Sequence, residues 1–255
     1  MKITKWFLLA MLALLCCACA KNDPLAYVDE DADEVIYFNL TGEFSDEIWD
    51  EFIKCQLQGF LGIKFFDDKG KFMGLSLKKN PAKIAVWKKY KKSEDDGESV
   101  VRKAVIVFED YEATEFLDDA AHWYEDQGDN YEARDKKIDD CKAIVCSKKV
   151  SGGEDEDEDE EIEMTIIASG KNVVQIIWSD KKVSQILEPE KACEAAGDID
   201  SKATFSYWTS AARLRDIQEK GGKKVLDLGN SVGNWYVDGD EITMEGVTDI
   251  SELTD

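Results

Sequence analysis

The chain has 255 residues, which is enough for one medium-sized domain or two small ones. It carries 55 acidic residues against 32 lysines and arginines, and the resulting charge of −23 excludes nonspecific nucleic-acid binding, which needs a basic surface. Hydrophobic residues make up 44% of the chain, too many for a disordered acidic segment. The single histidine, His122, excludes any mechanism or metal site that needs two imidazoles.

The first twenty residues have the three parts of a secretory signal. Residues 1–5 carry two lysines and no acid, residues 6–15 are all apolar, and small residues and cysteines follow as far as Ala20. A helix that spans a bilayer needs about 20 apolar residues, roughly twice the length of this run. The segment therefore predicts export, and a permanent transmembrane helix is the weaker interpretation.

Two processing sites compete at the end of this signal. Ala18-Cys19-Ala20 satisfies the small-x-small rule of ordinary signal peptidase, and cleavage after Ala20 would release a soluble secreted chain. Residues 15–19 resemble the lipobox of bacterial lipoproteins, although Leu15 lies one place early and Cys16 occupies the usual leucine position. This resemblance implies lipidation of Cys19 and attachment to the lipid bilayer through an N-terminal lipid anchor. We expect an exported protein anchored in the cell envelope, on its periplasmic or surface face, with secretion as the alternative.

Periodicity and turn residues predict the elements of the first half of the chain. Ser45 caps a helix in which apolar residues recur every three or four positions until Gly59. The predicted elements are a strand at 35–40, a helix at 45–59, a hairpin at 61–77, strands at 83–92 and 100–108, and a helix at 114–126.

The second half of the chain predicts further strands and one short helix. The segment from Ala203 fits either a strand or the start of a helix, and the pattern does not separate the two. Asp238-Gly239 suits a two-residue turn between paired strands. The predicted elements are strands at 142–150, 162–168 and 173–178, a helix at 190–196, and a hairpin at 235–244.

Strands outnumber helices in this list, and short turns join neighbouring strands. This predicts an α+β fold with a mostly antiparallel twisted sheet, two or three amphipathic helices and a C-terminal hairpin. The expected divisions are a signal peptide at 1–18, an acidic tether at 19–34, an α+β domain at 35–220 with an acidic loop at 152–161, and a C-terminal hairpin and tail at 221–255. The order of strand, helix, three strands and helix between Val100 and Ala196 resembles the PsbP-like α/β sandwiches of some bacterial lipoproteins, a resemblance that implies the fold only.

Four cysteines remain after the signal, and an even number in an exported protein suggests disulfides. Cys141 and Cys146 share one predicted strand, about 16 Å apart on opposite faces, so a bridge between them is rejected. We expect at least one bridge from Cys141 or Cys146 to Cys55 or Cys193, and four buried thiols are the alternative.

An unbroken run of eight acids follows Gly152-Gly153. It favours a solvated loop with weak cation binding, because an unbroken run does not preorganise a calcium cage. Its members are Glu154, Asp155, Glu156, Asp157, Glu158, Asp159, Glu160 and Glu161.

The one basic stretch of the chain favours a solvated strand face whose lysines block edge aggregation. Trp87 and Tyr90 lie among these lysines, and cations interleaved with aromatic residues also suit an acidic glycan. The lysines are Lys78, Lys79, Lys83, Lys88, Lys89, Lys91 and Lys92.

The sequence predicts no catalytic residue, metal site or cofactor. We therefore expect a membrane-tethered, non-enzymatic binding or structural module of the cell envelope, whose partner is an envelope protein or a glycan. The alternative is an extracytoplasmic hydrolase that uses a carboxylate pair.

Overall fold

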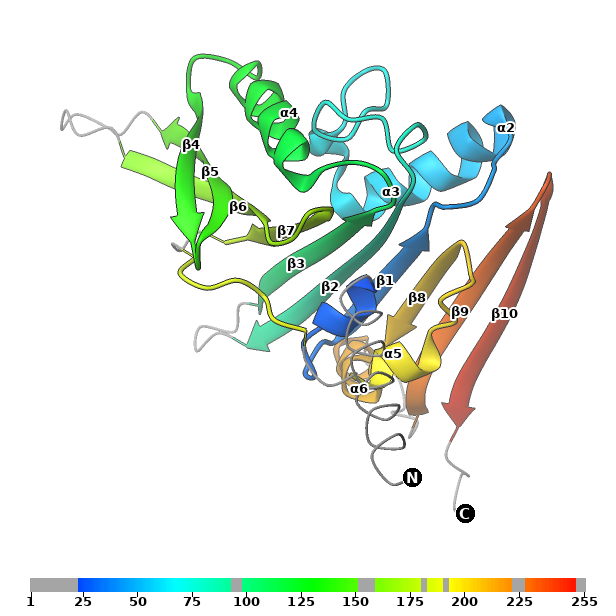
Figure 1. The fold of residues 1–255 in the computed structure, drawn as a ribbon. Coiled ribbons are helices and arrows are strands. Elements are labelled where there is room, and N and C mark those ends of the chain that lie inside the picture. The colour runs from blue at the N-terminus through cyan, green and yellow to red at the C-terminus, as the bar shows by residue number, and fades with distance from the viewer. Residues whose placement is uncertain are drawn as a thin grey trace, which may run out of the picture.

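The computed structural model describes residues 23–92, 98–150, 159–179, 183–189, 193–221 and 228–250. Within these residues, ten strands form one antiparallel sheet in the order β10-β9-β8-β1-β2-β3-β7-β6-β5-β4 (Figure 1). The fold class predicted from the sequence is thereby confirmed. The strands are β1 (Glu34–Asn39), β2 (Ala82–Lys92), β3 (Glu98–Phe108), β4 (Tyr131–Ile138), β5 (Cys141–Val150), β6 (Asp159–Ala168), β7 (Val173–Trp178), β8 (Phe205–Thr209), β9 (Leu228–Asp238) and β10 (Glu241–Ile250).

Two groups of helical segments cover opposite faces of this sheet. On the helix face, α2 (Asp46–Ile48), the π-helical turn η2 (Trp49–Ile53) and α3 (Lys54–Leu61) form one continuous rod beside α4 (Ala113–Glu125). On the opposite face, here the N-terminal face, η1 (Pro24–Tyr27) and α5 (Glu194–Asp198) pack against the central strands. The remaining helical segments are η3 (Ile63–Phe65) and α6 (Ala211–Lys220).

The period-two pattern of β1 explains how one sheet has two cores. Ile36 and Phe38 pack under the helices of the helix face, whereas Val35 and Tyr37 pack under η1 and α5. All four side chains are at most 1% exposed. The central strands are therefore buried on both faces, which accounts for their nearly continuous apolar sequence.

The acidic tether expected at 19–34 ends earlier than predicted. Pro24 begins η1, whose N-cap Asp23 accepts a hydrogen bond from the backbone N–H of Leu25 at 3.0 Å. Leu25, Tyr27 and Val28 are at most 6% exposed. Residues 23–33, here the N-terminal segment, therefore belong to the folded body because their apolar side chains complete the core of the N-terminal face.

The prediction of a hairpin at 61–77 is also wrong, because the segment forms no pair of regular strands. Only η3 and two isolated bridges form there, from Phe72 to Phe66 and to Leu75. The chain turns sharply at Met73 (φ 46°) and Gly74 (φ 84°), and a Cβ on Gly74 would lie 3.2 Å from the Asp119 carbonyl oxygen on α4. This tight turn buries Phe72 and Met73 completely between the helices, so the apolar alternation reflects burial and not strand pairing.

Strand β4 is missing from the sequence prediction because it is an edge strand. Its residues Glu-Ala-Arg-Asp-Lys-Lys show no apolar alternation, and most of its side chains are partly or fully exposed. It pairs only with β5, across a turn in which Asp139 and Asp140 both have positive φ. The run that resembled PsbP-like sandwiches therefore contains an additional strand and forms half of a larger sheet.

Several boundaries of the observed elements differ from the predicted ones. Residues 152–158 of the predicted acidic loop lie outside the described residues, and its last three residues belong to β6, which begins at Asp159 opposite Val150. The helix expected at 190–196 is observed as α5, and the segment after Ala203 forms both β8 and α6. The C-terminal hairpin is present, but β9 pairs with β8, so residues 228–250 extend the same sheet.

Candidate functional site

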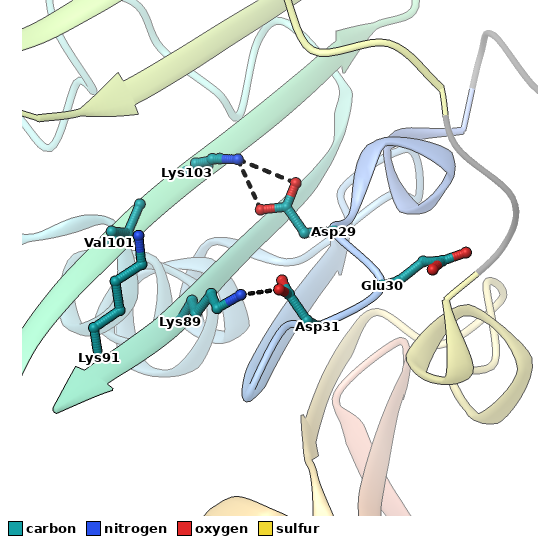
Figure 2. Close-up of a pocket in the computed structure, with 7 residues that line it drawn as sticks. All are labelled: Asp29, Glu30, Asp31, Lys89, Lys91, Val101 and Lys103. Carbon is teal, nitrogen blue, oxygen red and sulfur yellow. Dashed lines mark hydrogen bonds and ion pairs between the residues drawn. The ribbon is translucent and has the colours of Figure 1, made fainter.

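A concave site lies on the N-terminal face in the described part of the chain. It is a crevice of about 430 Å³ between the N-terminal segment and strands β2 and β3 (Figure 2). Its walls combine three acids from the segment with three lysines from the strands. The lining residues are Asp29, Glu30, Asp31, Lys89, Lys91, Val101 and Lys103.

The alternation of β2 and β3 brings these lysines to one face. Trp87 and Val105 are buried in the core of the N-terminal face, so residues two and four positions away along each strand point the same way. Lys89 lies opposite Val101 in the register of the two strands. Beyond the end of the core, both strands thus present lysines toward the N-terminal segment.

Two ion pairs hold the N-terminal segment against the strands. The Lys103 ammonium donates to both carboxylate oxygens of Asp29, at 2.7 and 3.1 Å, and Lys89 pairs closely with Asp31. The Lys103 and Asp29 side chains are only 21% and 25% exposed. A third contact comes from Asp33, whose carboxylate accepts from the Tyr90 backbone N–H at 2.8 Å.

Four of the charged groups that line the crevice therefore pair with one another, as Asp29 with Lys103 and Asp31 with Lys89. Figure 2 shows Asp29 and Asp31 directed toward lysines and Glu30 extending away from them. A carboxylate that is paired with an ammonium group has its oxygens occupied as hydrogen-bond acceptors. This arrangement suits attachment of the N-terminal segment better than acid catalysis.

The basic stretch predicted from the sequence is divided between the two faces of β2. Lys89 and Lys91 line the crevice, whereas Lys88 lies on the helix face beside Glu34, with their charged atoms 3.7 Å apart. Trp87 is 1% exposed and packs in the core of the N-terminal face. The aromatic platform for a glycan that the sequence suggested at Trp87 is therefore wrong.

On the helix face, the ends of four strands carry a polar row that the sequence prediction missed. Glu34, Lys88, Arg102 and Trp178 are direct cross-strand neighbours on β1, β2, β3 and β7. We call these four residues the cross-strand row. Arg102 itself could have indicated this row in the sequence. It is a charged residue two positions before Ala104, and alternation along the apolar strand places both on the helix face.

Glu34 is the acidic member of the row, and three donors surround it. The Tyr90 hydroxyl donates to its carboxylate at 3.0 Å, and Lys88 and Arg213 lie at 3.7 and 3.5 Å. The Arg213 guanidinium also stacks 3.5 Å above the Tyr90 ring. Burial and the Glu34 carboxylate raise the pKa of Tyr90 to about 12, so its hydroxyl remains a donor at neutral pH.

The disulfide predicted among the four described cysteines is not formed. Cys55 is exposed on α3, Cys146 is buried under the helix face, and Cys193 is buried on the N-terminal face. Cys141 is half-buried beside a small third cluster. All four thiols are free, so the bridge prediction is wrong, and burial raises the pKa of Cys146 to about 12.

The other predicted site residues lie partly or wholly outside the described residues. Cys19 lies outside them, as do five acids of the run, Glu154, Asp155, Glu156, Asp157 and Glu158. The last three acids, Asp159, Glu160 and Glu161, belong to β6 and lie opposite Val150, Lys149 and Lys148. Within the described residues, no group of three His, Cys, Asp or Glu side chains is arranged to hold a metal ion.

His122, the single histidine of the chain, is exposed on α4. Its Nδ1 lies 2.7 Å from the Asp118 carbonyl oxygen, and this contact raises the pKa of the imidazole. Its neighbours on the helix are acids and not a nucleophile.

None of the described helices is both long and apolar enough to span a bilayer. Comparisons of the chain with protein-family models, with curated proteins and with solved structures find no match in any of the three.

Proposed function

We propose that this protein is a lipid-anchored, extracytoplasmic binding or structural module of a bacterial cell envelope. The N-terminal signal and Cys19 in its degenerate lipobox support export and anchoring. Three residues, 20–22, separate Cys19 from Asp23, the first described residue. An extended chain spans at most about 3.6 Å per residue, so a lipid on Cys19 would hold the body within roughly 15 Å of the bilayer surface.

The observation that carries this proposal is the attachment of the N-terminal segment to the sheet. Leu25 and Val28 bury their side chains, and the Asp29–Lys103 and Asp31–Lys89 pairs add two links farther along. A free tether would need none of these contacts. Their presence supports a body that is coupled closely to its anchor.

The hydrolase alternative receives no support from the crevice. A glycoside hydrolase needs one carboxyl group that stays protonated at its working pH. Asp29 and Asp31 instead form ion pairs with Lys103 and Lys89, so neither carboxylate is free to act on a ligand.

The anchoring is tested by Cys19→Ser, with Cys55→Ser as the matched control. The wild type and the Cys55→Ser variant should fractionate with membranes and incorporate a fatty-acid probe. The Cys19→Ser variant should lose the probe and the anchored form, because only Cys19 carries the lipid. A wild-type protein that is unlipidated and begins at Lys21 would show that the chain is secreted.

A further inference from the structure

Arg102 is held on the helix face by aromatic rings, and no acid of the described residues pairs with it. Its guanidinium carbon lies 3.9 Å from the centroid of the Trp178 ring and 5.8 Å from that of Phe65. Gly62 packs against the same group, since a Cβ at Gly62 would lie 3.7 Å from the Arg102 Nη1 atom. Among the described residues, no carboxylate forms a hydrogen bond or an ion pair with Arg102.

This placement is costly in a chain that has 55 acids available. Burial alone lowers the pKa of Arg102 to about 10, and no acidic neighbour offsets that shift. Arg102 is half-buried, and a partly desolvated cation that lacks a counter-charge does not stabilise the fold, so an apolar replacement should be neutral or stabilising. Cation–π stacking on Trp178 orients the guanidinium but does not bond its in-plane N–H groups.

The neighbours of Arg102 in the cross-strand row supply further donors and no free acceptor. Lys88 lies beside it on β2, and the buried Trp178 Nε1–H has no acceptor. The one acid of the row, Glu34, is already surrounded by Tyr90, Lys88 and Arg213. The group is therefore complementary to negative charge that the described part of the protein does not provide.

We propose that Arg102 and Lys88 form a binding site for an oxyanion, a carboxylate or phosphate group carried by a ligand with an apolar part. The planar guanidinium presents paired N–H groups that match two oxygens of such a group. Trp178 positions the guanidinium by stacking. Two of the most exposed large hydrophobic residues lie close by in the chain and supply apolar contact: Val100, 47% exposed and two residues before Arg102, and Ile63, 72% exposed and next to Gly62.

The site is tested on the full-length protein with three probes: inorganic phosphate, acetate and butyrate. Each is titrated at constant ionic strength while the indole N–H resonance of Trp178 is followed, assigned with Trp178→Phe. We expect saturable shifts, with butyrate stronger than acetate if the ligand is a carboxylate with an apolar part, and phosphate strongest if it is a phosphate ester.

Arg102→Met should weaken binding of the preferred probe at least about tenfold, because the variant removes the charged fork. Its melting temperature should stay equal to that of the wild type or rise. Arg102→Lys, which keeps the charge and loses the fork, should bind with intermediate strength. The matched control is Arg134→Met, since Arg134 is exposed and already pairs with Glu132 at 2.8 Å.

Two results would overturn the proposal. One is a wild-type protein in which none of the probes shifts the Trp178 resonance at concentrations well above the millimolar range. The other is an Arg102→Met variant that binds as the wild type does, or that melts lower while its affinity is unchanged, which would make Arg102 a structural partner of Trp178.

Discussion

Strands β2 and β3 carry cations on both faces. Lys88, on the helix face of β2, lies 3.7 Å from Glu34, so the contrast is between Arg102 of β3 and the lysines of the N-terminal face. On the N-terminal face, Lys103 and Lys89 are paired with Asp29 and Asp31 of the N-terminal segment. On the helix face, Arg102, adjacent to Lys103 in sequence, stacks on Trp178 and has no acidic partner among the described residues. The difference arises from what packs opposite each face, since the strand pattern is the same. The paired lysines attach a segment of the chain, whereas Arg102 is the residue that we propose binds a ligand.

The contrast between the two faces requires that the N-terminal segment is part of the folded body. Leu25→Ala tests this requirement, and of the proposed variants it should have the largest effect on the free energy of unfolding. Leu25 is 3% exposed in the core of the N-terminal face. Its truncation should lower the free energy of unfolding by about 2–3 kcal/mol, measured by urea denaturation, because it leaves a cavity.

Glu30→Ala is the control for that measurement. Glu30 is exposed in the same segment and extends away from the lysines, so its removal should change stability by no more than about 0.5 kcal/mol. Equal stabilities of the Leu25→Ala variant and the wild type would return the segment to the role of a free tether.

Asp29→Asn removes the acidic partner of Lys103, so that Lys103 can be compared directly with Arg102. Because both side chains are about three-quarters buried, we expect a loss of about 1 kcal/mol in unfolding free energy. Loosening of the segment should also speed alkylation of Cys193, which is 6% exposed in the same cluster.

Cys146 serves as the internal control for this labelling. Only the thiolate reacts, and burial raises the pKa of Cys146 to about 12, so native protein at pH 9 should leave it unlabelled. Labelling of Cys146 should rise only as the pH approaches that value or as the protein unfolds. A faster rate at Cys146 in the Asp29→Asn variant would mean that the substitution opens the whole fold.

Deletion of the five acids 154–158 should have the smallest effect on stability. These residues lie far along the chain from Arg102 and Lys103. The deletion should change the free energy of unfolding by less than about 0.5 kcal/mol, since a loop of acids adds little packing. It removes five negative charges, so oxyanion binding at Arg102 should strengthen slightly at low salt and not at high salt. A loss of several kcal/mol on deletion would identify the run as a structural ion site.

Local patterns predicted most of the sheet but not the sites on it. The apolar run at 173–178 and the turn at Asp238-Gly239 lead to β7 and to the β9–β10 hairpin with few changes. The edge strand β4 was missed because its charged residues carry no periodic signal. The basic stretch that was predicted includes Lys88 and Lys89, but Lys103 and Arg102 were missed as site residues. Their contacts join residues that lie far apart in the chain, 74 positions in the case of Asp29 and Lys103.

The sequence by itself determined the α+β class, the antiparallel pairing of neighbouring strands and the expectation of an export signal. These depend on periodicity, turn chemistry and composition, which act within a few residues. Only the tertiary structure decided that residues 23–33 fold onto the sheet and that the described cysteines stay apart. It also decided that Lys103 has an acidic partner, whereas Arg102 has none within the part of the chain that the structure describes. Each of these outcomes depends on which distant segment packs against a given face, and such packing leaves no local signal in the chain.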